Sequence, residues 1–179
     1  MDSTFLIGLT GSLILLIGSA WPAEKVKLPY KSTKNWLFGI GSWIMLVYAI
    51  VGYLSWGAVF FIFMEILVAI SCILMMLPSR DRTNSIIIGG SGIVLIIWSL
   101  FLFQNYRTIL FVAGMAILGI GFASRLWSQR RNIALTLGSI FVAIFSYTEA
   151  SRIFFGMNTF FALFSLYYTI KGMREHKKK

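Results

Sequence analysis

The sequence contains few charged residues and almost none of the side chains on which enzymes most depend. Charged residues make up 12% of the 179 residues, whereas about a quarter is usual in soluble proteins. The single histidine, His176, lies in a basic tail, so the chain can build neither a histidine-based triad nor a histidine-rich metal site. The single cysteine, Cys72, can form no intramolecular disulfide. Because glycine-rich phosphate loops and nucleophile elbows are also missing, we expect no enzyme, no metal and no cofactor.

Apolar residues dominate the chain instead. They account for 58% of the sequence, and the mean hydropathy is +0.83. A soluble domain of this length could not bury so much apolar surface, so we predict an all-α integral membrane protein. The net charge of +10 is compatible with nucleic acid or anionic lipid, but cytoplasmic loops of membrane proteins also collect Lys and Arg. We therefore expect a lipid bilayer around the chain and no nucleic-acid partner.

Seven apolar segments are long enough to cross a bilayer, which takes about 20 residues. The predicted helices cover about residues 4–20, 36–51, 56–77, 85–103, 109–123, 133–147 and 153–170. They form a first three-helix repeat (1–78), a linker helix (79–106) and a second three-helix repeat with a basic tail (107–179). Small residues at Gly89-Gly90-Ser91-Gly92 predict close helix approach in the linker. Glu149 and Arg152 are expected to form an exposed ion pair.

The positive charges predict how the chain is oriented in the cell membrane. Loops one, three and five and the C-terminal tail hold 14 of the 16 Lys and Arg residues, and only Arg107 and Arg152 lie on the other side. Such an asymmetry over short loops predicts an outside N-terminus and a cytoplasmic C-terminus. An odd number of helices agrees with this orientation.

Two short patterns recur 97 residues apart. Lys34-Asn35 returns as Arg131-Asn132, and Gly41-Ser42 returns as Gly138-Ser139. Three crossings reverse the side of the chain, so a linker helix is needed for the second copy to run parallel to the first. Parallel repeats of this kind are one known plan for transporters, with the solute site near the midplane between the halves. Coincidence between two hydrophobic hairpins is the alternative.

The first loop and second helix carry Pro22, the basic Lys31-Ser32-Thr33, and the pair Trp43 and Tyr48. This pattern resembles the PQ-loop (MtN3) pattern of SWEET and SemiSWEET sugar transporters, although Ala23 replaces the usual glutamine and Ala49 the usual glycine. The three-plus-one-plus-three layout is also similar to that of PnuC-type vitamin transporters. The resemblance implies a facilitator for a sugar or vitamin-like solute that works by alternating access, with Pro22 as a hinge.

The same resemblance implies a solute site. In the family, an asparagine about thirteen residues past the tyrosine lines the site in each repeat. Tyr48 aligns with Phe145, so the second copy supplies Asn158, whereas the first supplies Phe61. One amide with more aromatic surface suits an apolar or aromatic solute, and Trp43 and Tyr48 are candidates to stack on it. An interhelical hydrogen bond for Asn158 and interfacial anchoring for the aromatics are the alternatives.

Glu65 is the one acid well inside a predicted helix. A carboxylate near the middle of a membrane is costly and usually faces the bundle interior, so it is a functional candidate. It lies four residues after Phe61, one turn along the same face. It can bind a cationic solute or carry a coupling proton. A neutral, protonated Glu65 that hydrogen-bonds within the packing is the alternative.

Other functions fit the same composition. A non-transporting membrane receptor or interaction protein on this fold is the main alternative, and a lipid-handling enzyme or its accessory subunit is a weaker one. The sequence leaves open the identity of the solute, the choice between uniport and proton coupling, and whether the chain forms a homo-oligomer.

Overall fold

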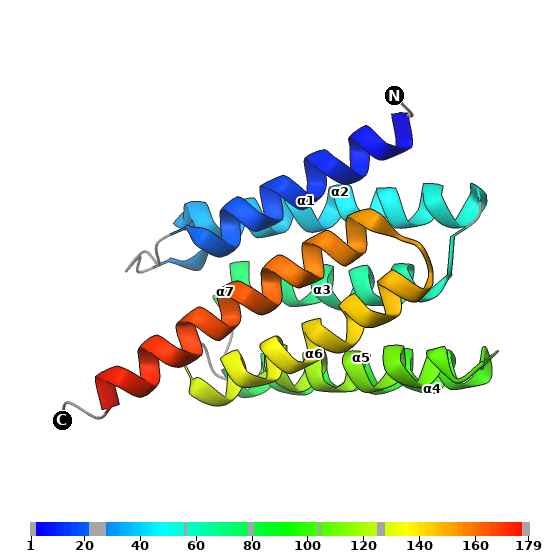
Figure 1. Ribbon diagram of the computed structural model, residues 1–179. Helices are drawn as coiled ribbons and strands as arrows, with labels where there is room; N and C mark the ends of the chain where they lie inside the picture. Colours follow the sequence, from blue (N-terminus) through cyan, green and yellow to red (C-terminus); the bar gives the residue numbers. More distant parts are fainter. Residues whose placement is uncertain are drawn as a thin grey trace. The chain divides into compact units, whose positions relative to one another are not determined.

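The computed structural model describes residues 3–21, 28–55, 57–78, 81–103, 105–124 and 128–176. These residues form seven α-helices and one short 3-10 helix, η1, with no strand (Figure 1). The elements are α1 (Ser3–Ala20), η1 (Pro29–Lys31), α2 (Thr33–Ser55), α3 (Phe60–Met76), α4 (Asp81–Phe101), α5 (Arg107–Ala123), α6 (Gln129–Thr148) and α7 (Arg152–His176). The predicted all-α class is confirmed, and each of the seven predicted helices is present.

Five of the helices, α1, α2, α4, α6 and α7, are long and apolar enough to cross a membrane. The other two, α3 and α5, are apolar and have 17 residues each, which is the lower end of the length that spans a bilayer. The chain is therefore a helical integral membrane protein. At about 1.5 Å per residue, the 25 residues of α7 exceed the roughly 30 Å of a hydrocarbon core.

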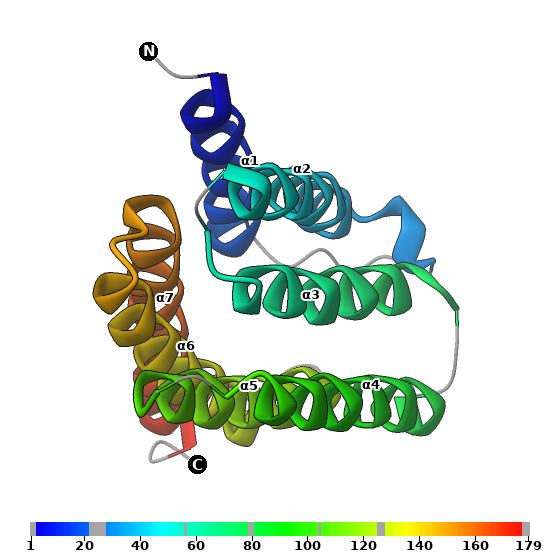
Figure 2. The ribbon, with the colours of Figure 1, turned by 90° about the vertical axis from the view of Figure 1, so that its right-hand side faces the viewer.

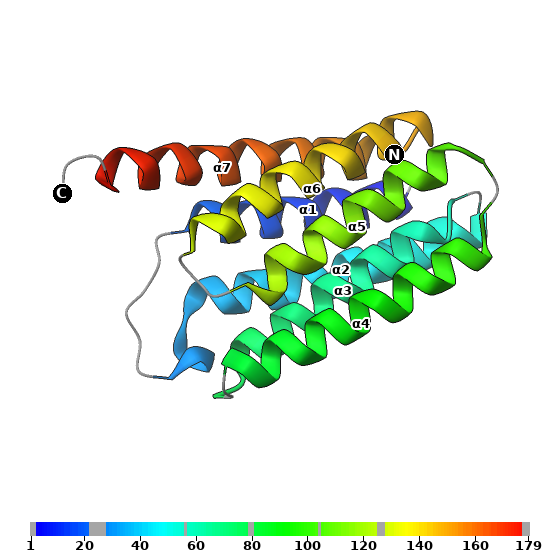
Figure 3. The same ribbon diagram turned by 90° about the horizontal axis from the view of Figure 1, so that it is seen from below.

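The chain divides into two compact units, Met1–Asn84 and Ser85–Lys179. In the first unit α2 contacts both α1 and α3 (Figure 2). In the second unit α6 contacts both α5 and α7 (Figure 3). Near the start of α4, the Ser85 hydroxyl donates to the Ala123 carbonyl at the end of α5. Helices α1–α3 in the first unit and α5–α7 in the second are thus three-helix arrangements in which the middle helix in sequence also packs in the middle, and the second unit contains most of α4 as well.

Glycines allow very close packing between α1 and α2. A Cβ built on Gly41 of α2 would lie 2.7 Å from Cγ and 2.9 Å from the backbone nitrogen of Leu15 in α1. A Cβ on Gly11 of α1 would lie 2.9 Å from Cγ2 of Ile44. No real side-chain carbon fits at such distances, so the two helices approach each other through bare backbone, as small residues permit in lipid.

The same contacts recur between α5 and α6. A Cβ on Gly138 of α6 would lie 2.8 Å from both Cγ and the backbone nitrogen of Leu118 in α5. A Cβ on Gly114 of α5 would lie 2.8 Å from Cγ2 of Val142. In both hairpins, therefore, a leucine of the first helix rests against a glycine of the second.

The matching contacts define two sequence intervals. Gly11, Leu15 and Gly18 of α1 correspond to Gly114, Leu118 and Gly121 of α5, 103 residues later. The α2 residues correspond to α6 residues at the 97-residue interval predicted from the sequence. All five buried positions of α2 have a buried counterpart at this interval: Gly39, Gly41, Ser42, Met45 and Ala49 match Thr136, Gly138, Ser139, Val142 and Ser146. The two intervals differ by six residues. The connection from α1 to α2 is therefore six residues longer than the connection from α5 to α6.

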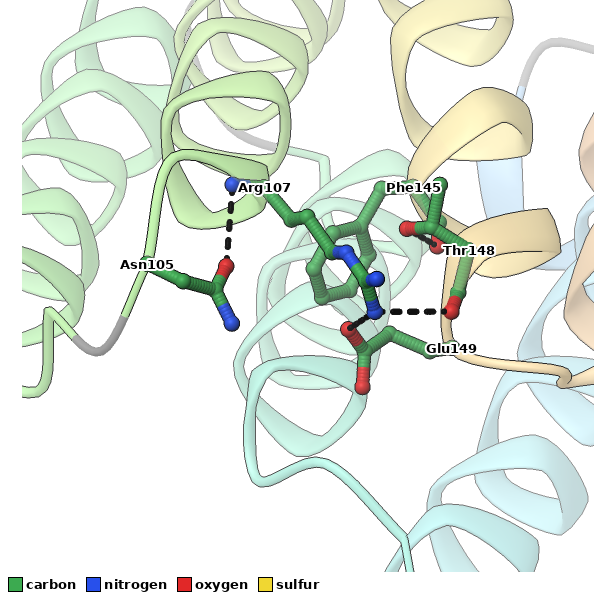
Figure 4. Close-up of polar contacts among 5 residues, drawn as sticks. All are labelled: Asn105, Arg107, Phe145, Thr148 and Glu149. Atoms are coloured by element: carbon green, nitrogen blue, oxygen red, sulfur yellow. Dashed lines mark hydrogen bonds and ion pairs between the residues drawn. The ribbon is translucent and has the colours of Figure 1, made fainter.

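At the end away from the basic loops, the start of α5 is tied to the end of α6 (Figure 4). The Arg107 guanidinium donates to the Thr148 carbonyl at 3.3 Å, and its Nη1 lies 3.9 Å from Oε1 of Glu149. The Arg107 backbone N–H is capped by Oδ1 of Asn105 at 2.9 Å. The prediction that Glu149 pairs with Arg152 is wrong, because the carboxylate faces α5 rather than the start of α7.

Two of the linker glycines differ from expectation, whereas Gly92 of the same stretch is buried. No atom lies within 4 Å of a Cβ built on Gly89 or Gly90, so these two positions mediate no close helix approach in the described part of the chain. Both glycines have an ordinary helical conformation.

Helix α6 ends in a Schellman motif with an unusual residue. The Ser151 N–H donates to the Ser146 carbonyl at 2.9 Å, and the Ala150 N–H donates to the Tyr147 carbonyl at 3.1 Å. Ala150 has a φ of 53°, in the left-handed region where glycine is normally found. An alanine there bears the steric cost of that region, because its Cβ crowds the backbone.

We expect Ala150→Gly to raise the free energy of unfolding by about 0.5–1 kcal/mol. The left-handed conformation costs alanine roughly 1–2 kcal/mol, and the greater chain entropy of glycine takes back about 0.5–1 kcal/mol of that gain. Thermal unfolding of the purified protein in detergent measures the change. Ala150→Val, which worsens the crowding, should lower the melting temperature, and a lower value for the glycine variant would contradict the assignment.

Candidate functional site

The 97-residue interval relates α3 only in part to α7, because six of the ten buried residues of α3 fall on α7 residues that are not buried. Four buried residues of α3, Phe60, Phe61, Glu65 and Cys72, fall on four buried residues of α7, Met157, Asn158, Ala162 and Thr169. Phe61 and Asn158, which the spacing relates, are both buried. The two helices differ most in chemistry at two of these positions, where α3 carries a phenylalanine and an acid and α7 carries an amide and an alanine.

Asn158 lies in the second turn of α7 and is 3% exposed. Its side-chain amide donates to the Phe154 carbonyl one turn earlier, at 2.9 Å. An amide carries two donor hydrogens and an acceptor oxygen, so this bond engages one part of the group. The back-bond fixes the side chain along its own helix, which suits either a packing residue or a preorganised solute contact.

Phe61 and Glu65 lie on the buried side of α3, one turn apart as predicted. Phe61 is in the first turn, where its N–H donates to the Ala58 carbonyl at 3.2 Å. Helix α3 begins at Phe60 rather than near residue 56, because Gly57 caps the preceding helix through an N–H bond of 2.7 Å to Gly52. Phe61 belongs to the first unit and Asn158 to the second, and their meeting at one solute site stays a prediction.

Glu65 is completely buried, with no exposed surface. Neither of its carboxyl oxygens has a hydrogen-bond partner among the described residues. Buried polar groups are nearly always hydrogen-bonded, so each exception requires an explanation. The predicted alternative, in which Glu65 hydrogen-bonds within the packing, is not what the described residues show.

No family model, curated protein or solved structure matches this chain.

The aromatic candidates on α2 lie in different surroundings. The Tyr48 ring packs against α1, where its Cε2 would be 2.7 Å from a Cβ on Gly8. Its counterpart Phe145 packs against Phe111 of α5 with ring centroids 5.2 Å apart. These contacts give both rings a role in hairpin packing. Trp43 is 53% exposed on the outer side of α2, where lipid would cover it. Solute contacts for Trp43 and Tyr48 stay predictions, and the proposed hinge Pro22 lies outside the described residues.

A group of side-chain hydrogen bonds to backbone carbonyls at the basic end of the first unit was not predicted from the sequence. The Asn35 amide, at the start of α2, donates to the carbonyls of Pro29 in η1 at 2.9 Å and Met75 in α3 at 3.2 Å. The adjacent Lys34 donates to the Trp21 carbonyl at 3.0 Å, and the Trp36 indole donates to the Tyr30 carbonyl at 2.8 Å. Three consecutive side chains thereby hold the ends of α1, η1 and α3. The recurrence of Lys34-Asn35 as Arg131-Asn132 drew attention to these two positions. It did not indicate which carbonyls their side chains bind.

Among the described residues, no group of three or more His, Cys, Asp or Glu side chains is placed to hold a metal ion. What these residues offer is binding chemistry: one buried amide, one buried acid without a partner, and aromatic surface.

Proposed function

We propose that the protein is a membrane transporter that moves a small solute by alternating access between two three-helix repeats. The observation that carries this proposal is the repeated pair of hairpins, in which Leu15 meets Gly41 and Leu118 meets Gly138 through the same atoms. A duplicated three-helix unit with a linker helix is a plan used by transporters. The resemblance of the first loop and α2 to PQ-loop proteins points in the same direction.

The proposed orientation has the N-terminus outside and the C-terminus in the cytoplasm. It rests on the concentration of 14 of the 16 basic residues in alternate loops and the tail. Labelling of a cysteine placed at position 31 in intact cells tests it, since a residue reachable from outside would reverse the assignment.

In this proposal the third helices of the two repeats supply the solute contacts. Asn158 provides a directed hydrogen bond, because its side chain is held by its own helix. Phe61 provides an apolar surface at the equivalent position. A site with one amide and one ring fits a small solute with an apolar or aromatic part, such as a vitamin-like molecule, better than a sugar with hydroxyls on every side.

The test begins with thermal-shift screening of purified protein against sugars, nucleosides, vitamins and amino acids. Each compound that stabilises the protein is then offered in labelled form to liposomes that contain it. Entry faster than into empty liposomes supports transport. Binding without entry would instead favour a receptor on the same fold.

We expect Asn158→Ala to weaken binding of the solute by about 1–3 kcal/mol, because a buried amide would lose its hydrogen bond to the ligand. This corresponds to roughly 5- to 150-fold in the dissociation constant. Thermal shift or isothermal titration of the variant with the compound found in the screen measures the loss.

Thr159→Ala is a matched control for the asparagine variant. The Thr159 hydroxyl makes the same kind of bond to the carbonyl four residues earlier, at 2.8 Å to Phe155. Both variants lose one such bond, whereas binding should fall only for Asn158→Ala. If Asn158→Ala unfolds while its folded fraction binds normally, the asparagine serves packing and the site lies elsewhere.

A further inference from the structure

Glu65 is an exception among the buried polar side chains of this protein. Several buried hydroxyls in the helices donate to a carbonyl of their own helix: Ser42, Ser71, Ser99, Ser146 and Thr169. Glu65 has no exposed surface and both of its oxygens lack a partner in the described part of the chain. An ionised carboxylate at such a place would be very costly, because neither water nor a donor offsets its charge.

No counter-charge for Glu65 comes from the elements that contact α3, which are α2 and η1. Lys34 of α2 donates to the carbonyls of Ser19 and Trp21, and Lys31 of η1 is exposed. The titratable tyrosines are also directed elsewhere: Tyr30 and Tyr53 are about half exposed, and the Tyr48 ring lies against Gly8. On α3 itself the other titratable group is Cys72, two turns further along. The ion pair found in the described residues joins Arg107 to Glu149.

The chemistry of the site selects among ligands. A metal ion takes several oxygen, nitrogen or sulfur ligands, whereas the described residues offer no cluster of acids, histidines or cysteines. A proton needs only one carboxyl oxygen and no additional space. It also removes the charge that makes the buried carboxylate costly.

The second repeat has no acid at the position that the 97-residue interval relates to Glu65. The position equivalent to Glu65 on α7 is Ala162, which is also buried and cannot hold a proton. At this pair of buried positions the first repeat therefore carries an ionisable group and the second does not.

We propose that Glu65 is a single-proton site that couples the movement of the solute to the movement of one proton. This inference rests on the proposed transport function. A proton from water on one side forms an O–H bond with a Glu65 oxygen, and the same bond breaks when the site opens to the other side. No bond in the solute forms or breaks, and the carboxyl returns to its starting state.

The proton itself is the first probe. Infrared spectra of the full chain reconstituted in lipid are recorded in acidic and alkaline buffer, and the carbonyl stretch of a protonated carboxylic acid is followed. We expect a band that shifts in heavy water, is absent in Glu65→Gln and persists in Glu149→Gln, a control at the half-buried acid that pairs with Arg107. A wild-type protein without this band, or a Glu65→Gln protein that keeps it, would overturn the site.

The second measurement tests coupling. Liposomes that contain the protein and an internal pH-sensitive dye receive a mixture of labelled sugars, nucleosides, vitamins and amino acids from outside. Solute entry accompanied by a change in internal pH, with the pH change lost in Glu65→Gln, supports the proposal. Solute entry without any proton movement overturns the coupling but leaves transport standing, whereas a Glu65 band without solute entry argues against the transport function itself.

Glutamine resembles a protonated glutamate in shape and charge, so Glu65→Gln should fold. If it does not, Glu65→Asp gives the second comparison, because a shorter acid at this position should keep a carboxyl band at a changed frequency. An unchanged band in the aspartate variant would assign the signal to another group and overturn the site.

Discussion

Replacing Gly138 by leucine should separate α5 from α6 and leave little folded protein. A Cβ at this position would already lie 2.8 Å from the backbone nitrogen of Leu118, and a backbone atom cannot rotate away as the end of a side chain can. Overpacking a core by a few methylene groups typically costs about 1–3 kcal/mol. A leucine here must displace a whole helix, so we expect a loss comparable with the total stability of a domain, about 5–15 kcal/mol.

Gly41→Leu should have a similar effect on the first hairpin, since its Cβ would meet the Leu15 nitrogen at 2.9 Å. Gly90→Leu on α4 is the matched control, because no atom lies within 4 Å of a Cβ there. The yield of monodisperse protein in detergent and its unfolding by heat or by SDS measure the three variants. Gly138→Leu as stable as Gly90→Leu would contradict the packing, and with it the repeated hairpins that support the proposed function.

Much of this arrangement could be predicted from the sequence because membrane helices leave long apolar runs. The Gly41-Ser42 and Gly138-Ser139 pairs predicted the correspondence of α2 with α6, since two helix backbones can touch only where a residue has no side chain in the way. The correspondence of α1 with α5 was predicted from the order of the helices, but its interval of 103 residues was not. The connection between the first two helices is six residues longer than its counterpart, so Gly11 and Gly114 are out of step with the 97-residue interval.

Helix ends were the least predictable part. Thr33, Lys34 and Asn35 were assigned to a loop, but they form the first turn of α2, where the side chains of Lys34 and Asn35 donate to carbonyls of other segments. The charged end of α7 up to His176 was assigned to a tail, yet it is helical. Basic residues are favourable at a helix C-terminus because they interact with the helix dipole. Hydropathy alone does not contain this information.

The candidate site could be predicted only as a list of residues. Spacing from Tyr48 and Phe145 led to Phe61 and Asn158, and both residues are buried. That Glu65 has no hydrogen-bond partner among the described residues could not be predicted, because it depends on which side chains the neighbouring helices direct toward it. The predicted partner of Glu149 was wrong for the same reason. Proximity in the sequence favoured Arg152, whereas the fold places Arg107 of α5 beside Glu149.

The two hairpins differ at one matched contact. In the first, the Tyr48 ring rests on the backbone of Gly8. In the second, Phe111 occupies the position of Gly8, and its ring packs on Phe145 at 5.2 Å between centroids with an angle of 53°. Both phenylalanines are almost fully buried, at 0% and 1% exposed. Two rings therefore fill in the second unit the space that one ring and a close backbone fill in the first.

We expect Phe111→Ala to lower the free energy of unfolding by about 3–5 kcal/mol, the range for removing a buried phenylalanine, which includes an aromatic pair term of about 0.5–1.5 kcal/mol. Lipid does not remove this cost, because helices in membranes associate through packing, and a cavity forfeits that packing. Phe101→Ala on α4 is the control, since that ring is 84% exposed and contributes little to the interior. Unfolding by SDS in mixed micelles measures both variants and also Phe145→Ala.

The double variant of Phe111 and Phe145 should lose less unfolding free energy than the sum of the two single variants, because both rings border one cavity. Additive losses, or a Phe111→Ala protein as stable as Phe101→Ala, would show that the two rings do not form the central contact of the second hairpin.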